Sequence, residues 1–262
     1  MNNQTDLFGQ PDEPVLADLI SAGALFYVSH SGGKDSQAMY LRMAALIPPA
    51  QLVVVHADLG AVEWTGTQAH IRATITLPLN VVRAVDSAGE NKNLLRMVEL
   101  RSEKRPDAPA WPSSKIRYCT SDLKRGPIEK FIRGDMSARG ATLAVNCMGL
   151  RAEESPGRAK RDSWSTNARL SKAGRTVYDW LPVHELTTNQ IFQTIADAGQ
   201  SPHYAYALGN ERLSCVFCIF GSDNDLRNGA AQRPELAAAY IELEARTGKT
   251  MFHTASLAER IA

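Results

Sequence analysis

The fold is decided by residues 24–36, which read ALFYVSHSGGKDS. The apolar run Ala24–Val28 predicts a buried strand, and apolar residues at helical spacing over Ser36–Leu46 predict a helix. The polar stretch between them contains the adjacent pair Gly32 and Gly33 and so predicts a tight loop. A strand that leads through glycines into a helix brings backbone N–H groups toward the positive end of the helix dipole. This is the geometry of an anion-binding site.

We expect the whole loop to hold phosphates, and its residues are Ser31, Gly32, Gly33, Lys34, Asp35 and Ser36. The two glycines have no Cβ atom to obstruct an anion, and the serines add hydroxyl donors. Lys34 adds positive charge, and Asp35 could either cap the helix or hold a magnesium ion. The alternative is a glycine-rich turn that only caps a helix, but the complete string between a strand and a helix favours the anion site.

Strands and helices alternate beyond this loop. Short apolar or β-branched runs predict further strands, and helical spacing predicts further helices. The expected strands are 51–56, 79–85, 141–148 and 177–181, and the expected helices are 15–22, 91–100, 121–133, 187–198 and 234–247. This order is typical of an α/β fold with a doubly wound parallel sheet, which binds ligands beyond the carboxyl ends of its strands. The polar segment Arg151–Arg175 is expected to form a mobile lid.

The expected organisation is a single nucleotide-binding domain behind a tail. Residues 1–14 are polar with two prolines and predict a flexible segment. Residues 15–262 are expected to form the domain, in which residues 200–262 make a C-terminal extension that carries Cys215 and Cys218.

Composition points to a soluble globular protein, because 44% of the 262 residues are hydrophobic and 22% are charged. No apolar run approaches the length of a membrane span, and no basic region followed by an apolar stretch marks a secretory signal. We therefore expect a cytoplasmic protein. In reducing surroundings its four cysteines are thiols or metal ligands rather than disulfides.

Positive charge is concentrated in the middle of the chain. Residues 91–133 hold eleven basic residues against five acidic ones, although the net charge of the chain is only +1. Such a segment is either a solvated surface or a face that attracts phosphate or nucleic acid.

The loop resembles the PP-loop signature of the superfamily that contains the ATP pyrophosphatases and the phosphoadenosine phosphosulfate (PAPS) reductases. The resemblance continues after the second predicted strand, where residues 56–60 and the pair Glu63-Trp64 look like the segment that turns over the adenosine. It implies that Asp58 contacts the base or the ribose. An ordinary strand-to-helix turn is the alternative interpretation of this segment.

A second motif follows the fourth predicted strand. Gly149-Leu150-Arg151, with Glu154-Ser155 and Arg158, is similar to the superfamily's glycine-arginine-acid-serine motif. The resemblance implies that Gly149 belongs to the nucleotide site and that Arg151 and Arg158 grip phosphates, which suits guanidinium geometry. It also implies that the catalytic residues are Lys34, Asp35 and Arg151. The alternative for both arginines is exposure on a basic lid.

Three cysteines form a candidate metal site. Cys215 and Cys218 are separated by two residues, so both thiolates can reach one metal ion or cluster. Cys119 lies where cluster-bearing members of the superfamily place their first cysteines. The three could hold a [4Fe-4S] cluster, with an open or different fourth ligand, or a zinc ion, and the alternative is free buried thiols. Cys147 is expected to pack in the core.

The sequence departs from the reductases of this superfamily at two places. It has no cysteine after Cys218, where the assimilatory reductases carry a nucleophilic cysteine in a Glu-Cys-Gly-His-type tail. Tyr118 stands where the cluster-bearing reductases have a cysteine adjacent to the equivalent of Cys119. The remaining resemblance is closest in style to the DNA-phosphorothioation-type members, which adenylate an oxygen with ATP and then replace it with sulfur.

We therefore expect an enzyme that performs ATP-dependent adenylation and sulfur transfer to an acceptor, with nucleic acid as a candidate acceptor. Adenylation turns an oxygen into a leaving group that sulfide can displace, and Mg²⁺ would neutralise the departing pyrophosphate. Reduction of a sulfonucleotide, either PAPS or adenosine phosphosulfate (APS), is the alternative function.

A third hypothesis is a non-catalytic nucleotide-binding module associated with DNA. The peptide Gln4–Phe8 resembles the short motif by which bacterial replication and repair proteins dock on the sliding clamp, with Gln4, Leu7 and Phe8 as its anchors. A disordered tail without a partner is the alternative for this peptide. Such a module would bind nucleotide without releasing pyrophosphate.

Overall fold

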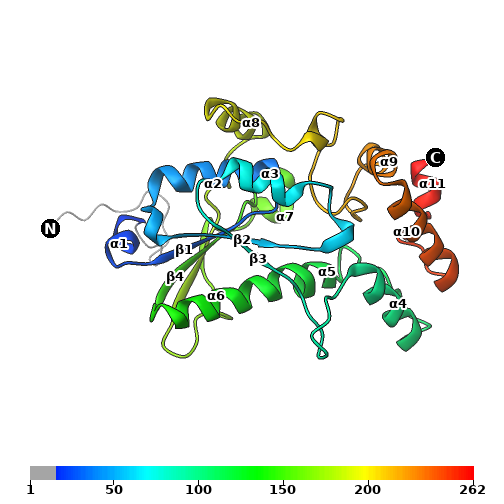
Figure 1. Ribbon diagram of the computed structural model, residues 1–262, viewed down its shortest axis with the longest axis horizontal. Coiled ribbons are helices and arrows are strands. Elements are labelled where there is room, and N and C mark those ends of the chain that lie inside the picture. The colour runs from blue at the N-terminus through cyan, green and yellow to red at the C-terminus, as the bar shows by residue number, and fades with distance from the viewer. Residues whose placement is uncertain (1–15) are drawn as a thin grey trace.

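The computed structural model describes residues 16–262, and within this part of the chain the strands form one six-stranded sheet (Figure 1). The strand order is β3-β2-β1-β4-β6-β5. The strands are β1 (Leu25–Ser29), β2 (Leu52–Ala57), β3 (Leu79–Val82), β4 (Leu143–Cys147), β5 (Trp164–Thr166) and β6 (Thr176–Trp180). All neighbours pair in parallel except β5 and β6, so the expected α/β doubly wound sheet is confirmed with an antiparallel edge strand.

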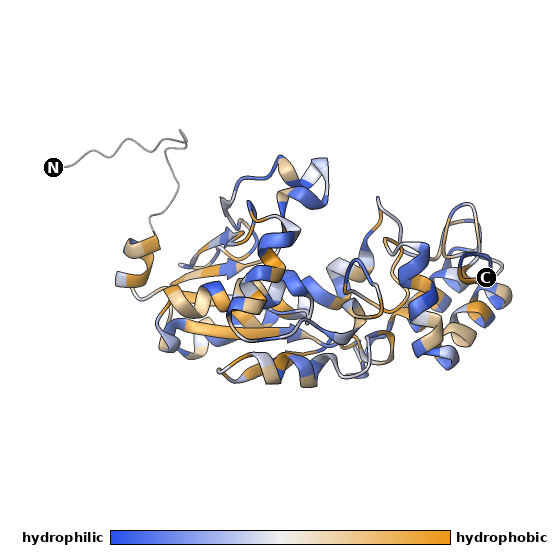
Figure 2. Cartoon of the chain, turned by 90° about the horizontal axis from the view of Figure 1, so that it is seen from above, coloured by the Kyte–Doolittle hydropathy of each residue, from blue (hydrophilic) through white to orange (hydrophobic). Residues whose placement is uncertain are grey.

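Helices cover both faces of the sheet. The helices of the described chain are α1 (Leu16–Ser21), α2 (Lys34–Leu46), α3 (Thr67–Thr74), α4 (Leu94–Lys104), α5 (Tyr118–Thr120), α6 (Gly126–Ala138), α7 (Pro156–Ala159), α8 (Thr188–Asp197), α9 (Asp223–Gln232), α10 (Pro234–Thr247) and α11 (Leu257–Ile261). Helices α2 and α8 pack with one set of strand residues, and α6 packs with the alternate set. Hydrophobic strands between helices of mixed hydropathy are visible in Figure 2.

The order of the strands places two loops side by side. Strand β1 pairs with β2 on one side and with β4 on the other, and Val28 is opposite Cys147 in the β1–β4 pair. The chain winds outward in opposite directions from these two strands, so their carboxyl ends form the topological switch point of the sheet. The loops that begin at His30 and at Met148 both leave the sheet there.

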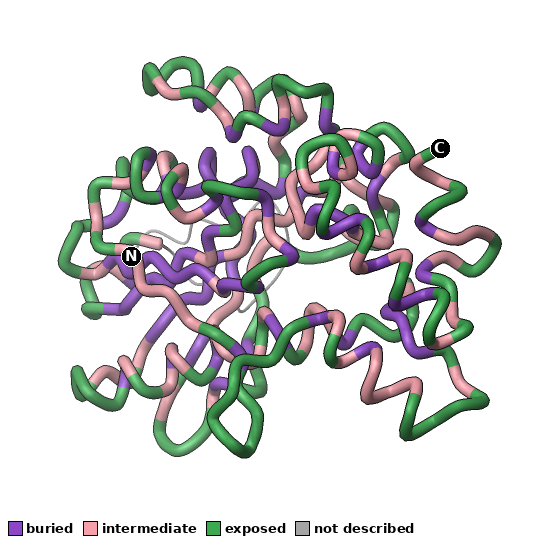
Figure 3. The backbone as a smooth tube through the Cα atoms, turned by 45° about the vertical axis from the view of Figure 1, so that its right-hand side comes forward, coloured by how far each residue is buried: buried purple, intermediate pink, exposed green. Residues whose placement is uncertain are grey.

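A second hydrophobic core lies beyond the carboxyl ends of the strands. It joins α4, α9, α10 and α11 to the segments around Trp111 and Phe217, and its centre includes the fully buried Tyr240. Figure 1 shows these helices standing apart from the sheet layers, and Figure 3 shows buried segments in both regions. The expected cysteine-bearing extension at residues 200–262 contributes to this core together with earlier parts of the chain.

Segment 151–175 differs from the expected mobile lid, because it is built into the edge of the sheet. It contains α7 and strand β5, and the Trp164 ring stacks on Trp180 with centroids 4.7 Å apart. The side-chain amide of Asn167 also donates to Asp179 at 2.9 Å. The polar composition of the segment concealed these anchors, since a three-residue edge strand has too little periodicity to be recognised.

Other differences are local. The helix expected at 121–133 is preceded by α5 and by a π-helical turn at Ser121–Arg125, and α9 was not expected. The tail and the clamp-like peptide with Gln4, Leu7 and Phe8 lie outside the described residues. Between residues 16 and 262, no helix has the length and apolarity needed to span a membrane.

Candidate functional site

The glycine-rich loop joins β1 to α2 at the switch point, as its sequence predicts. Helix α2 begins at Lys34, and no side chain caps its N-terminus at Gly33. The two serines close the loop on itself: the Ser31 amide donates to Oγ of Ser36 at 3.1 Å, and that hydroxyl donates to the Gly33 carbonyl at 2.9 Å. Gly32 has a φ of +82°, a conformation that favours glycine.

Some amides of this loop are satisfied and others are available. The Gly32 amide donates to Nδ1 of His30 at 3.1 Å, and the Lys34 amide donates to the Tyr206 hydroxyl at 3.0 Å. Within residues 16–262, no acceptor is assigned to the amides of Asp35 and Ser36 in the first turn of α2. Unpaired amides at a helix N-terminus favour an anion.

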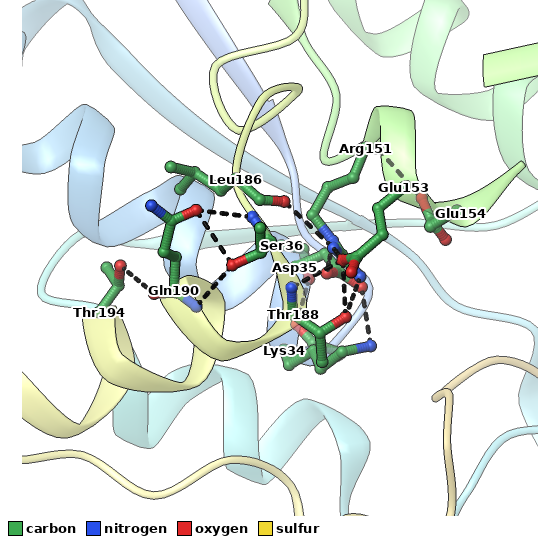
Figure 4. A network of polar contacts seen from close by, with 12 residues as sticks. Lys34, Asp35, Ser36, Arg151, Glu153, Glu154, Leu186, Thr188, Gln190 and Thr194 are labelled. Atoms are coloured by element: carbon green, nitrogen blue, oxygen red, sulfur yellow. Dashed lines mark hydrogen bonds and ion pairs between the residues drawn. The ribbon is translucent and has the colours of Figure 1, made fainter. Parts of the chain in front are cut away.

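Asp35 is held between two buried cations (Figure 4). Nζ of Lys34 lies 3.3 Å from one carboxylate oxygen, and Nε of Arg151 donates to the other at 2.6 Å. Lys34 is 5% exposed and the Arg151 side chain 3%, so both charges depend on these contacts for compensation. The Lys34 ammonium also donates to the Glu211 carbonyl at 3.3 Å.

The other contacts of Arg151 connect the loop to α8. Its guanidinium donates to Glu153 at 2.5 Å, to the Leu186 carbonyl at 3.1 Å and to the Thr188 hydroxyl at 3.0 Å. Glu153 in turn accepts from the Thr188 amide at 2.7 Å. In this structure the guanidinium of Arg151 contacts protein acceptors, Asp35 among them. The expectation that Arg151 grips phosphates stays a prediction.

Gly149 touches the backbone of the phosphate loop. A Cβ atom at this position would lie 3.2 Å from the carbonyl carbon and oxygen of Asp35 and from the amide nitrogen of Ser36. The absence of a Cβ atom at residue 149 therefore allows the loop after β4 to lie close to the first turn of α2.

Two other expected nucleotide-binding residues have protein partners. Asp58 accepts from the Gly60 amide at 2.7 Å and from Gln68 at 2.9 Å, and it pairs with Arg83. Its carboxylate is 4% exposed and lines a hollow of about 310 Å³, together with Glu63 and Trp64 among other residues. The hydrogen bonds and Arg83 lower the pKa of Asp58 against the opposing effect of burial. Contact with a base or ribose through this carboxylate stays a prediction.

Arg158 pairs with Glu154 and faces other cations. Burial, followed by the proximity of Arg212 and Arg117, lowers the pKa of its guanidinium, and Asp35 opposes this shift. Arg158 therefore lies near the loop in a cluster of positive charge, where phosphate would be attracted.

The structure brings Cys119, Cys215 and Cys218 around one lysine. Burial would lower the pKa of Lys124, but the three cysteines near it raise that pKa. Burial raises the pKa of Cys119 and raises that of Cys215 to about 12. Among residues 16–262, no three histidine, cysteine, aspartate or glutamate side chains are arranged to hold a metal ion. The predicted cluster or zinc site is therefore not shown.

Several residues of the site were not found from the sequence. Tyr206 reaches the loop from a segment far along the chain, Thr188 contacts Arg151 from α8, and Glu153 contacts Arg151 from two residues away. No spacing signal marks Tyr206 or Thr188, because their roles depend on contacts between distant parts of the chain. His30 adjoins the motif and could have been noticed as a buried polar residue at the end of β1.

The sequence profile of the phosphoadenosine phosphosulfate reductase domain matches residues 26–220. That range contains the phosphate loop, the Gly149–Arg151 turn and the three clustered cysteines. The chain belongs to the phosphoadenosine phosphosulfate reductase family.

Individual relatives are more distant. An uncharacterized 37.8 kDa protein in the gpa 5′ region of Escherichia phage 186 is 29% identical over 135 residues, which cover 51% of this chain and 39% of that protein. PAPS reductase from Candida auris, in a phosphate complex, is 13% identical with a TM-score of 0.46 over 72% of this chain and 80% of that one. FMN adenylyltransferase from Candida glabrata, in complex with FAD and pyrophosphate, is 13% identical with a TM-score of 0.40 over 74% and 55%.

Substituting Gly149→Ala should weaken adenine nucleotide binding, because the added methyl group pushes the Asp35–Ser36 backbone out of place. Overpacking of this kind costs about 1–3 kcal/mol, which corresponds to roughly tenfold in affinity if the strain falls on the bound state. Isothermal titration with ATP measures the effect. Gly134→Ala on α6 is the control, since a Cβ atom there meets nothing within 4 Å. Equal ATP affinities of the two variants would contradict the expected effect of the contact between Gly149 and the Asp35–Ser36 backbone.

Acid should destabilise the protein through His30. Burial lowers its pKa from 6.5 to about 3, with help from His56 and His70, and its Nε2 has no hydrogen-bond partner among the described residues. Between these two values the unfolded state binds more protons, so stability falls as the pH drops below 6.5. The loss at pH 5 is ~2 kcal/mol from this residue.

Urea unfolding at pH 7 and pH 5 tests this contribution. The variant His30→Gln should lose less stability between the two pH values than the wild type does. His253→Gln, at an exposed position, should behave like the wild type. A His30→Gln variant with the wild-type pH dependence would show that burial of His30 does not control the acid response.

Proposed function

We propose that this chain binds an adenine nucleotide on residues 31–36 and uses ATP to activate an acceptor oxygen for replacement by sulfur. The acceptor oxygen attacks the α-phosphorus of ATP, giving an AMP ester and pyrophosphate. Sulfide then displaces AMP, so the C–O or P–O bond of the acceptor breaks and a bond to sulfur forms. ATP supplies the leaving group and inorganic sulfide supplies the sulfur.

One observation carries the proposal: the first turn of α2, in which the amides of Asp35 and Ser36 have no acceptor within residues 16–262, lies at the switch point beside a buried lysine and an oriented carboxylate. Unpaired amides and the helix dipole suit the phosphates of a nucleotide. The Lys34 ammonium suits negative charge that develops on the leaving pyrophosphate. Arg158 and its neighbouring arginines extend this positive field away from the loop.

Magnesium fits this proposal as a part of the nucleotide substrate. Asp35 is poorly suited to be a protein ligand for Mg²⁺, because its two carboxylate oxygens contact Lys34 and Arg151. An iron–sulfur cluster or a zinc ion at Cys119, Cys215 and Cys218 is not shown, because no group of three possible ligands is found among residues 16–262. No step of the proposed reaction passes through such a group.

Reduction of a sulfonucleotide is the second candidate, and the match to the PAPS reductase domain favours it. The same loop would hold the phosphates of PAPS or APS. A thiol would attack the sulfate sulfur, breaking its S–O bond and releasing the adenosine phosphate. The second thiol of a dithiol would then displace sulfite from the resulting S–S bond and form a disulfide. The two candidates differ in their products, which are pyrophosphate and AMP from ATP in one case and sulfite from the sulfonucleotide in the other.

The test uses the full chain with ATP and sulfide, and in parallel with PAPS and a dithiol. Isothermal titration should detect ATP binding, and Gly33→Val should abolish it, since added methyl groups fill the loop where a Cβ already meets the Tyr206 hydroxyl at 3.3 Å. Lys34→Ala should weaken binding roughly tenfold, because it removes one charged contact. Lys130→Ala, on the exposed part of α6, is the matched control.

Pyrophosphate release in the presence of an acceptor supports sulfur transfer, whereas sulfite from PAPS supports reduction. Nucleotide binding without either product would support the non-catalytic module. Equal ATP affinity of the wild type and Gly33→Val would contradict the loop assignment itself.

A further inference from the structure

An exposed aromatic ring lies between guanidinium groups beside the phosphate loop. Phe220 is 37% exposed, and the guanidinium carbons of Arg117 and Arg212 lie 4.9 Å and 5.9 Å from its ring centroid. We call Phe220, Arg117 and Arg212 the Phe220 platform. We propose that the Phe220 platform binds single-stranded nucleic acid, with a base stacked on the ring and phosphates paired to the arginines.

The ring is held in place by a tight turn. The Gly221 amide donates to the Cys218 carbonyl at 2.8 Å, so Phe220 lies within a four-residue turn. A Cβ atom on Gly221 would lie 3.2 Å from that same carbonyl oxygen, and Arg260 of α11 donates to the Gly221 carbonyl at 3.4 Å. A ring displayed on an anchored turn loses little conformational freedom when a base stacks on it.

The positive charge around the ring is not balanced by the protein. Within residues 16–262, no carboxylate lies within 4 Å of the guanidinium nitrogens of Arg117 or Arg212. Arg158 is paired with Glu154, and its pKa is lowered by burial and by the proximity of Arg212 and Arg117. Guanidinium groups that lie close together repel one another, and a bound anion relieves this repulsion. A phosphodiester chain supplies several anions at regular intervals.

The Phe220 platform is continuous with the proposed nucleotide site. The carbonyl of Glu211, next to Arg212 in the chain, accepts from the Lys34 ammonium at 3.3 Å. The leucine that follows, Leu213, lies 3.4 Å from the Cβ position of Gly33. A strand on the Phe220 platform would therefore pass beside the phosphate loop. The idea that this strand is the acceptor rests on the proposed function. The idea that the strand binds the Phe220 platform does not.

The experiment measures fluorescence anisotropy of labelled single strands of about 12 nucleotides, oligo-dT and oligo-U, with the full chain. Phe220→Ala should weaken binding about fivefold or more, and Phe220→Tyr should restore it, because stacking needs a ring. An abasic strand with the same phosphates should bind the wild type about as weakly as the intact strand binds Phe220→Ala. Arg117→Ala should reduce the slope of log K against log salt concentration by about 0.7.

Arg42→Ala is the matched control, because Arg42 is exposed on α2 and no carboxylate lies within 4 Å of it in the described chain. ATP titration of each variant separates this proposal from the proposed function: oligonucleotide binding can fail while ATP binding is intact, and the reverse. Equal oligonucleotide affinity of Phe220→Ala, Arg117→Ala and Arg42→Ala would overturn the proposal. So would full displacement of the strand by saturating ATP, which would assign the Phe220 platform to the nucleotide itself.

Discussion

The ion pair between Arg151 and Asp35 joins the two loops at the centre of the sheet. Arg151 follows β4 and Asp35 lies in the first turn of α2, so this contact of 2.6 Å connects segments that are 116 residues apart in the chain. The Arg151 side chain is only 3% exposed and that of Asp35 is 18% exposed. Removing Asp35 would leave the buried Arg151 charge with less compensation, a change that typically costs about 3–5 kcal/mol in a buried ion pair. The shape of the first turn of α2 therefore depends on a residue outside the glycine-rich loop.

The same pair determines what the site can do. Two cations hold the Asp35 carboxylate in one orientation, and the amides of Asp35 and Ser36 have no acceptor within residues 16–262. Gly149 adds a steric constraint, since its missing Cβ lets the loop after β4 lie against the backbone of Asp35. A preorganised set of donors of this kind is suited to phosphate charge, because it does not have to reorganise when the charge arrives.

Sequence patterns were sufficient to predict the parallel sheet and the position of the glycine-rich loop. The strand–glycine–helix order around Gly32 and Gly33 predicted the loop between β1 and α2, and the alternation of strands and helices predicted the doubly wound sheet. Phosphate binding by this loop stays a prediction. The patterns were insufficient for the direction of β5 and for the partners of Arg151, Asp58 and Lys34. A charged residue in a motif indicates a functional region, but whether its charge faces a ligand or another side chain depends on contacts that arise only in the folded chain. The cysteines illustrate the same limit, because the sequence suggested that Cys119, Cys215 and Cys218 come together, whereas the burial of Lys124 among them depends on the folded chain. A metal site at these cysteines is not shown within residues 16–262.

An NMR titration of ¹⁵N-labelled protein with ATP tests most directly whether the amides of Asp35 and Ser36, together with the rest of the loop, receive the phosphates. The amide resonances of residues 31–36 should move during the titration, with those of Asp35 and Ser36 moving most. Saturable ATP binding that leaves these resonances unchanged and moves others would contradict phosphate binding by this loop.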